Sequence, residues 1–343
     1  MRMKNLVATK SLALLLLASS LPALAQKNWD VAKTLPIGGQ GSWDYLTVDP
    51  ATHRLFVPRS THTMIIDADS GKTLGDIPGQ KTAHGVAIVP EVNRGFITDG
   101  GGDGAIVIFD LKTYATLGKI TAQPDADGII YDPSIGRILV VSGDKGVLMS
   151  FKPDIDPTNG KLDAPIALGG APEFLAADGK GKVYINLEDK NEVAVVDFKA
   201  GKVVARWPVA PGGAPVGMSM DTKTRQLFIG CRKPQKLIVM SADNGKILSD
   251  LPIGAGVDAT KFDAGQAFAS CRDGSLAVAR ETSPGKFEIV QTVKTPQGAR
   301  TMGIDPTTHR IYLPTAEFED PKPGATGRPV MKPGTFMIVV VAQ

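Results

Sequence analysis

The residues best placed for chemistry share one position in a repeated sequence pattern. Each copy of the pattern contains an Asp-Pro turn or its equivalent, and the residue five places before that turn is ionisable in six of seven copies. In chain order the seven residues at this position are Asp44, His84, Asp127, Glu173, Val216, Asp258 and Arg300. If the copies form a ring, the six ionisable side chains (the rim residues) meet around one opening and shift one another's pKa values.

Four carboxylates at one opening need compensating positive charge, which a metal ion, a cationic ligand or Arg300 would supply. For a metal, the expected ligands are His84, Asp127, Glu173 and Asp258. Oxygen-rich ligation suits Ca²⁺ or Mn²⁺, and an imidazole adds a preference for Zn²⁺. In an enzyme, His84 and Asp127 would hold the metal or act as acid and base, with Arg300 stabilising negative charge.

Further candidates for ligand binding lie next to the rim positions. Arg59, Arg232 and Arg272 follow apolar runs and could clamp a carboxylate or phosphate. Trp43 and Tyr45 flank Asp44 and could offer a stacking surface. A simpler alternative stays open, in which the rim carboxylates cap backbone N–H groups or pair with neighbouring repeats.

The repeat itself predicts how these residues are positioned. Residues 48–58, VDPATHRLFVP, return almost unchanged at 304–314 as IDPTTHRIYLP, and five looser copies lie between them. The copies start roughly 40 residues apart, a period typical of propeller blades or solenoids. Each copy has an apolar run, a polar turn and a second apolar run, which indicates a strand, a tight turn and a strand.

The expected fold is all-β, a seven-bladed β-propeller with four-stranded antiparallel blades. Residues 35–38 and 251–254 both read LPIG, so the N-terminal strand, about 28–37, is expected to complete the last blade. The seven blades are expected at about 43–79, 84–122, 126–169, 172–210, 215–254, 257–294 and 299–341.

The second strands carry a family resemblance. They read FVPR at 56–59, FITD at 96–99, YINL at 184–187 and FIGC at 228–231, and Gly-Lys turns recur after them. In these features the chain resembles the YVTN family of seven-bladed β-propellers, which includes YncE-like exported proteins. No repeat spells Tyr-Val-Thr-Asn, so the resemblance implies the fold and transfers no active-site residue.

Residues 1–25 have the pattern of a cleaved signal peptide, with a basic start, an apolar run and Ala23-Leu24-Ala25. They hold three of the 38 basic residues and none of the 35 acidic ones, so the remainder carries 35 of each. We therefore expect a periplasmic or secreted single domain, residues 26–343, without a membrane span and monomeric. Balanced charge and 6% aromatic residues argue against a general nucleic-acid binder.

Three further features have competing interpretations. Residues 315–334 form a long loop in the last repeat, which either covers the opening or makes no ligand contact. His53 and His309 occupy equivalent turns and are expected to be turn residues. Cys231 and Cys271 are expected to be free thiols rather than a bridge, because equivalent positions in adjacent blades are too far apart.

These residues predict an exported protein that binds a small polar or anionic ligand at its opening, directly or through a divalent metal. One alternative is an enzyme at the same site, either a metal-assisted lactone hydrolase or a lyase for polysaccharides containing uronate. The other alternative is a scaffold for protein interactions.

Overall fold

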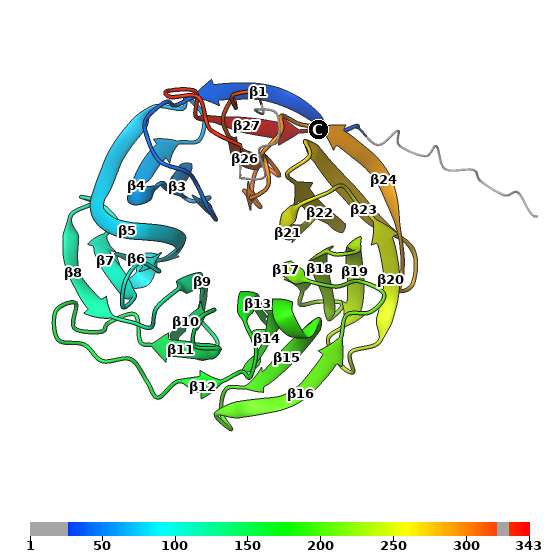
Figure 1. Cartoon of the computed structure of the whole chain (residues 1–343), viewed down its shortest axis with the longest axis horizontal. Helices are drawn as coiled ribbons and strands as arrows, with labels where there is room; N and C mark the ends of the chain where they lie inside the picture. Colours follow the sequence, from blue (N-terminus) through cyan, green and yellow to red (C-terminus); the bar gives the residue numbers. More distant parts are fainter. Residues whose placement is uncertain (1–26, 321–328) are drawn as a thin grey trace, which may run out of the picture.

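The computed structural model describes residues 27–320 and 329–343. Within these ranges the chain has 27 strands and two short 3₁₀ helices, η1 (Pro90–Val92) and η2 (Glu188–Lys190). The strands form six antiparallel sheets of four to seven strands, arranged in a ring (Figure 1). In the described part of the chain, no helix has the length and hydropathy needed to span a membrane. The expected signal peptide and part of the long loop lie outside the described residues.

Four of the sheets consist of strands that follow one another in sequence. The first contains β9 (Ala126–Asp132), β10 (Arg137–Ser142), β11 (Val147–Phe151) and β12 (Ile166–Ala167). The second contains β13 (Pro172–Ala177), β14 (Lys182–Leu187), β15 (Glu192–Asp197) and β16 (Lys202–Pro208). The third contains β17 (Pro215–Asp221), β18 (Gln226–Arg232), β19 (Gln235–Ser241) and β20 (Ile247–Pro252). The fourth contains β21 (Val257–Asp263), β22 (Gln266–Cys271), β23 (Ser275–Ser283) and β24 (Lys286–Lys294).

A seven-stranded sheet occupies the N-terminal part of the ring. It contains β2 (Thr47–Asp49), β3 (Arg54–Pro58), β4 (Ser60–Asp67), β5 (Thr73–Val89), β6 (Arg94–Asp99), β7 (Ala105–Asp110) and β8 (Thr116–Thr121). The 17-residue strand β5 joins two halves, because residues 73–78 pair with β4 and residues 86–89 pair with β6. The two blades expected to end near 79 and to begin near 84 are therefore joined by one continuous strand.

The sixth sheet joins the two ends of the chain. It contains β1 (Asp30–Pro36), β27 (Met337–Ala342), β26 (Ile311–Thr315) and β25 (Gly303–Ile304). β1 pairs antiparallel with β27, from Asp30 opposite Ala342 to Pro36 opposite Met337. The N-terminal strand therefore completes the last sheet, as expected. This pairing also covers the strand edge that β27 would otherwise expose.

The core lies between neighbouring sheets, because each sheet buries both faces. On β3, Leu55 and Val57 pack in one apolar cluster with Tyr312 of β26, whereas Phe56 packs in another with Phe109 of β7. Side chains alternate between the faces of a strand, so a strand buried on both sides is apolar almost throughout. This explains the uninterrupted apolar runs of the second strands.

The two turn histidines and the two cysteines lie as expected. His53 and His309 have φ values of 53° and 58°, the left-handed conformation of a tight turn. Cys231 and Cys271 are free and buried. Burial raises the pKa of both thiols to about 12, so neither carries an appreciable thiolate fraction at neutral pH.

Candidate functional site

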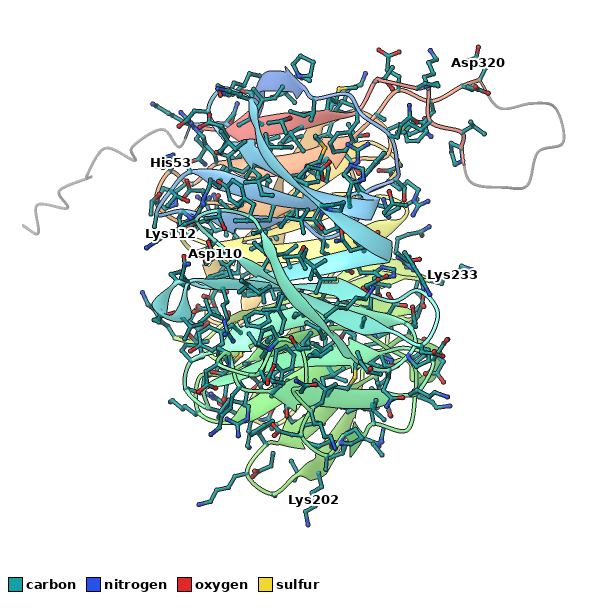
Figure 2. The ribbon with its side chains drawn as sticks, turned by 90° about the vertical axis from the view of Figure 1, so that its left-hand side faces the viewer. His53, Asp110, Lys112, Lys202, Lys233 and Asp320 are labelled. Atoms are coloured by element: carbon teal, nitrogen blue, oxygen red, sulfur yellow. The ribbon has the colours of Figure 1, made fainter. Side chains whose placement is uncertain are left out.

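The rim residues lie where the innermost strands begin. His84 belongs to β5, Asp127 to β9, Glu173 to β13 and Asp258 to β21, while Asp44 precedes β2 and Arg300 precedes β25. Figure 1 places β9, β13, β17 and β21 nearest to the centre of the ring. Figure 2 shows the two faces of the disc, with Lys233 and Asp320 on one side and His53 on the other. The rim residues belong to the face of Lys233, since Arg232, its neighbour in the chain, contacts the rim residue Asp258.

His84 brings two carboxylates together. Its Nδ1 atom lies 2.9 Å from Asp44 Oδ2 and 3.6 Å from Asp127 Oδ1. A Cβ at Gly100 would lie 2.9 Å from His84 Nε2, so a larger residue there would displace the ring. Burial disfavours the imidazolium, but the hydrogen bond with Asp44 and the charges of Asp127 and Asp44 outweigh it. Together they raise the pKa of His84 to about 9.

Asp127 carries a buried oxygen without a hydrogen-bond partner. That atom is Oδ1, the one nearest to His84. Burial raises the pKa of Asp127 to about 7, against the opposing charge of His84 and with smaller contributions from nearby carboxylates that include Asp44 and Asp125. A buried, unpartnered carboxylate oxygen is costly, so this part of the site favours a proton or a cation.

A second group joins Asp258 to two arginines. Arg300 Nε lies 2.5 Å from Asp258 Oδ2, and Arg232 Nη2 contacts Asp258 Oδ1. Burial raises the pKa of Asp258, although the two arginines oppose the rise. Arg232 also pairs with Glu188 at 3.3 Å, so the two guanidinium groups face two carboxylates beside the His84 group. The expected placement of Arg232 and Arg300 near the rim carboxylates is thus seen in these contacts.

Glu173 interacts with a residue that the sequence reasoning missed. Burial, then the charges of Asp127 and Glu188 and a hydrogen bond with Glu188, raise the pKa of Glu173 to about 9. Glu188 lies in η2 and accepts a hydrogen bond of 3.3 Å from Arg232 Nη1. Aligning the second strands places Glu188 at the position of Arg232, and that signal could have revealed it.

Tyr45 forms the floor beneath the rim residues. Its hydroxyl donates a 3.1 Å hydrogen bond to the backbone oxygen of Asp258, and its ring lies 4.5 Å from that of Phe174. Burial raises the pKa of Tyr45 well above its usual value, and the charges of all four rim carboxylates add to the rise. All four rim carboxylates therefore influence the ionisation of Tyr45. This contribution goes beyond the stacking surface expected for it.

Arg59 is placed differently from the other arginines. It is fully buried, its guanidinium stacks 3.6 Å from the centre of the Phe336 ring, and it donates hydrogen bonds to backbone oxygens that include that of Gly41 at 2.8 Å. All of these partners belong to the protein framework. We therefore assign Arg59 to the framework and leave it out of the candidate site, contrary to the expectation that it binds ligand.

Trp43 and Arg272 line a smaller cavity beside the rim. The cavity has a volume of about 290 Å³, and Arg300 also lines it. Trp43 is 5% exposed, its indole Nε1 has no hydrogen-bond partner, and Arg300 lies 5.8 Å from its ring centre. This position suits the expected contact of Trp43 and Arg272 with a ligand.

The described parts of the long loop form an arm over this cavity. Glu319 N donates to the backbone oxygen of Val330 at 2.8 Å, and Phe318 pairs with Met331 in a β-bridge. The Phe318 ring lies 6.2 Å from that of Trp43, and both Phe318 and Met331 line the cavity. The loop thus contacts the site through its two ends.

One group of at least three potential metal ligands occurs in the described ranges, and it consists of Asp44, His84 and Asp127, with donor atoms within 4.8 Å of one another. Glu173 and Asp258, which were expected as ligands, are not part of it. Glu173 interacts with Glu188, and Asp258 is held by two arginines. Asp44 is therefore the third potential metal ligand, in place of Glu173 and Asp258.

Comparison with known proteins identifies the fold. No family model matches the chain, and no curated protein matches it. The WD40 repeats of RRP9 superpose with a TM-score of 0.74 at 11% identity, covering 90% of this chain and 97% of that one. The chain folds as a β-propeller. The structure of U3-55K gives a TM-score of 0.72 at 11% identity, over 90% of this chain and 97% of that one.

A third propeller-like structure belongs to an enzyme. The hydrazine synthase of Kuenenia stuttgartiensis has a TM-score of 0.67 at 13% identity, covering 81% of this chain and 92% of that one. At these identities the likeness concerns the fold alone, since one fold hosts many functions. The expected propeller is confirmed, and membership of the YVTN family stays a prediction.

Proposed function

We propose that the mouth of this propeller binds a divalent cation at Asp44, His84 and Asp127, and through it a small anionic ligand. The observation that carries the proposal is the buried Asp127 Oδ1, which has no hydrogen-bond partner and lies 3.6 Å from His84 Nδ1, in a group whose three ligand atoms lie within 4.8 Å of one another. Two carboxylates and one imidazole suit Mn²⁺ or Zn²⁺ better than Ca²⁺, which prefers oxygen ligands throughout.

The anionic ligand is inferred from the groups beside the cation site. Arg300 contacts Asp258 and also lines the adjacent cavity, so its guanidinium is the cationic group that a carboxylate or phosphate in that cavity would meet. The 290 Å³ cavity between Trp43 and the arm offers space for an organic group of that ligand. A ligand with a short anionic head would then contact the cation and Arg300 together.

Metal titration of the purified protein tests the cation site. We expect one Mn²⁺ or Zn²⁺ per chain by calorimetry and elemental analysis, and at least tenfold weaker binding in Asp127→Asn and in His84→Ala. His309→Ala and Asp263→Asn are matched controls, because their side chains form an imidazole–carboxylate pair of 2.6 Å at the other end of the inner strands. Unchanged metal binding in both test variants would contradict the proposal.

Catalysis at the same mouth is the second candidate. It is favoured by the position of Arg300, whose guanidinium lies beside the cation site and could stabilise negative charge that develops on a substrate. Lactones and uronate-containing polysaccharides are the first substrates to test. If turnover disappears in Asp127→Asn and persists in Asp263→Asn, the function of the mouth is hydrolysis or elimination and not binding alone. If neither metal nor anion binds, a scaffold role for the propeller becomes the better account.

The proposal includes a count of seven blades. The halves of the seven-stranded sheet are joined through β5, whose first part pairs with β4 and whose second part pairs with β6. Counting β5 once in each half turns this sheet into two four-stranded blades. Together with the five four-stranded sheets this gives seven blades, as the seven sequence repeats predict.

A further inference from the structure

A larger cavity lies inside the ring, below the mouth. Its volume is about 900 Å³, and its walls come from the inner strands, with Val86, Ile129, Met218 and Met220 among the apolar lining residues. It extends to Ser134 and other residues of the turns at the opposite face. Binding sites for small molecules have volumes of about 300–1,000 Å³ and mostly apolar walls, so this channel has the size of a ligand site.

The floor of the mouth separates the two compartments. Tyr45 and Phe174, whose rings lie 4.5 Å apart, both line the channel at its inner end. Among the described residues that line the channel there is none of the six rim residues. The channel is therefore a site of its own, reached from the face opposite the proposed cation site.

One cationic side chain enters this apolar channel. Lys261 of β21 lines the cavity, and its Nζ atom lies 5.6 Å from the centre of the Phe174 ring, at the inner end. In the described part of the chain, no carboxylate forms an ion pair with Lys261. Burial lowers its pKa, as expected for an ammonium group that lacks an anionic partner.

Asp132 is the other charged residue of the lining; one of its carboxylate oxygens is hydrogen-bonded, and the other, Oδ2, is buried without a hydrogen-bond partner. Its Oδ1 accepts a 2.9 Å hydrogen bond from the backbone N of Ser134, within the turn after β9. Asp132 thus belongs to the turn at the outer end, and Lys261 provides the positive charge at the inner end. The channel consequently combines a long apolar wall with one cation at its closed end.

We propose that this channel binds an amphiphilic carboxylate, with the carboxylate at Lys261 and the aliphatic chain directed along the channel toward the opposite face. An anion would give the ammonium group the partner that the protein does not supply. The aliphatic chain would cover the apolar side chains of the inner strands. The two features select a medium-chain carboxylate over a neutral or cationic amphiphile.

Calorimetry with decanoate, decanol and decylamine tests this inference. We expect the wild-type protein to bind decanoate at least tenfold more tightly than decanol or decylamine. Lys261→Met should lose that preference, and Lys261→Arg should retain most of it. Ala177→Trp, which narrows the channel at a lining residue near the turns, should abolish decanoate binding and serves as a second test if Lys261→Met does not fold.

His84→Ala is the control that separates this site from the proposed cation site. It should bind decanoate like the wild type, whether or not the metal proposal holds. No decanoate binding by the wild type, equal binding of decanoate and decanol, or unchanged decanoate binding in Lys261→Met or Ala177→Trp would overturn the inference.

Discussion

Two acidic side chains that share a hydrogen bond define the chemistry of one side of the mouth. Glu173 and Glu188 can form this bond only when one of them holds a proton, and the pKa of Glu173, raised to about 9, identifies it as the protonated partner. Arg232 contacts Glu188 at 3.3 Å and compensates its charge. At neutral pH the raised pKa of Glu173 therefore removes one negative charge from this side of the mouth.

Replacing Glu173 by Gln should make the protein less sensitive to alkaline pH. The folded pKa of Glu173 lies far above the ordinary value of 4.5, so its contribution to stability is complete below pH 4.5 and is lost as pH rises through 9. We expect Glu173→Gln to match the wild type at pH 5 and to exceed its free energy of unfolding by at least ~1 kcal/mol at pH 9. Urea unfolding at both pH values measures the difference.

Glu288→Gln is the matched control for this prediction. Glu288 pairs with Lys286 on the surface at 2.9 Å, with 52% of its side chain exposed. Surface pairs contribute little to stability, so its substitution should leave the pH dependence unchanged. A Glu173→Gln curve parallel to that of the wild type from pH 5 to 9 would show that Glu173 titrates normally.

Arg59 shows what sequence reasoning at the level of residues could and could not reach. Arg59 and Arg232 both follow a second strand and look equivalent. In the aligned strands, however, Arg59 corresponds to Cys231, and both are fully buried. The repeat alignment therefore contained the distinction between a framework arginine and a mouth arginine. The contact of Arg59 with Phe336 could not be predicted, because Phe336 is distant in sequence and is brought close to Arg59 by ring closure.

At the scale of elements, the N-terminal segment joins two sheets. Trp29 is 4% exposed and packs 5.0 Å from the ring of Phe268, and its indole N donates a 2.8 Å hydrogen bond to Gln266. The strand that follows, β1, pairs with β27. Trp29 thus anchors β1 to the neighbouring sheet, which contains β22, while β1 itself completes the sheet of β25, β26 and β27.

Trp29→Ala should destabilise the protein strongly. Removing a buried aromatic side chain costs about 3–5 kcal/mol, and the loss of its hydrogen bond leaves Gln266 without that partner. Val31→Ala serves as control, because Val31 of β1 is 40% exposed and its substitution should change the free energy of unfolding by less than about 0.5 kcal/mol. Equal midpoints for both variants in thermal unfolding would refute the anchoring role of Trp29.

The sequence predicted elements well where the pattern was local. The repeated apolar runs located the strands within a few residues, and the shared LPIG segments revealed the partner of β1. The continuity of β5 was not predictable, because Gly79 and Gln80 resemble a turn and only pairing on both sides keeps the strand extended. Glu188 was missed although the alignment of the second strands places it at the position of Arg232, and its partner Glu173 lies on β13, which pairs with β14.

At the scale of the whole molecule, the ring creates two sites from one set of strands. The starts of the inner strands provide the charged mouth, and their middle parts provide the apolar channel, with Tyr45 and Phe174 between them. Asp258 lies at the start of β21 and Lys261 three residues further along it, so one strand contributes to the mouth and to the channel. Substitutions in one compartment should consequently leave binding in the other intact.

Closure of the ring gives the last prediction. Asp30 pairs with Ala342, so the beginning of β1 lies beside the end of the chain. A permuted chain that joins residue 343 to residue 27 through a short Gly-Ser linker, and opens in the exposed turn between Ala200 and Gly201, should fold. In this permutant the pairing of β16 with β15 closes the ring in place of β1 with β27, because termini in exposed turns are tolerated.

The expected result is one cooperative unfolding transition and metal binding like that of the uncut chain. Deleting residues 27–36 provides the comparison, since it removes Trp29 and the whole of β1 and leaves the edge of β27 unpaired. That shortened chain should unfold at lower temperature and aggregate through the open edge. A permutant as unstable as the deletion variant would mean that the covalent order of the strands, and not the closed ring, determines the stability of this propeller.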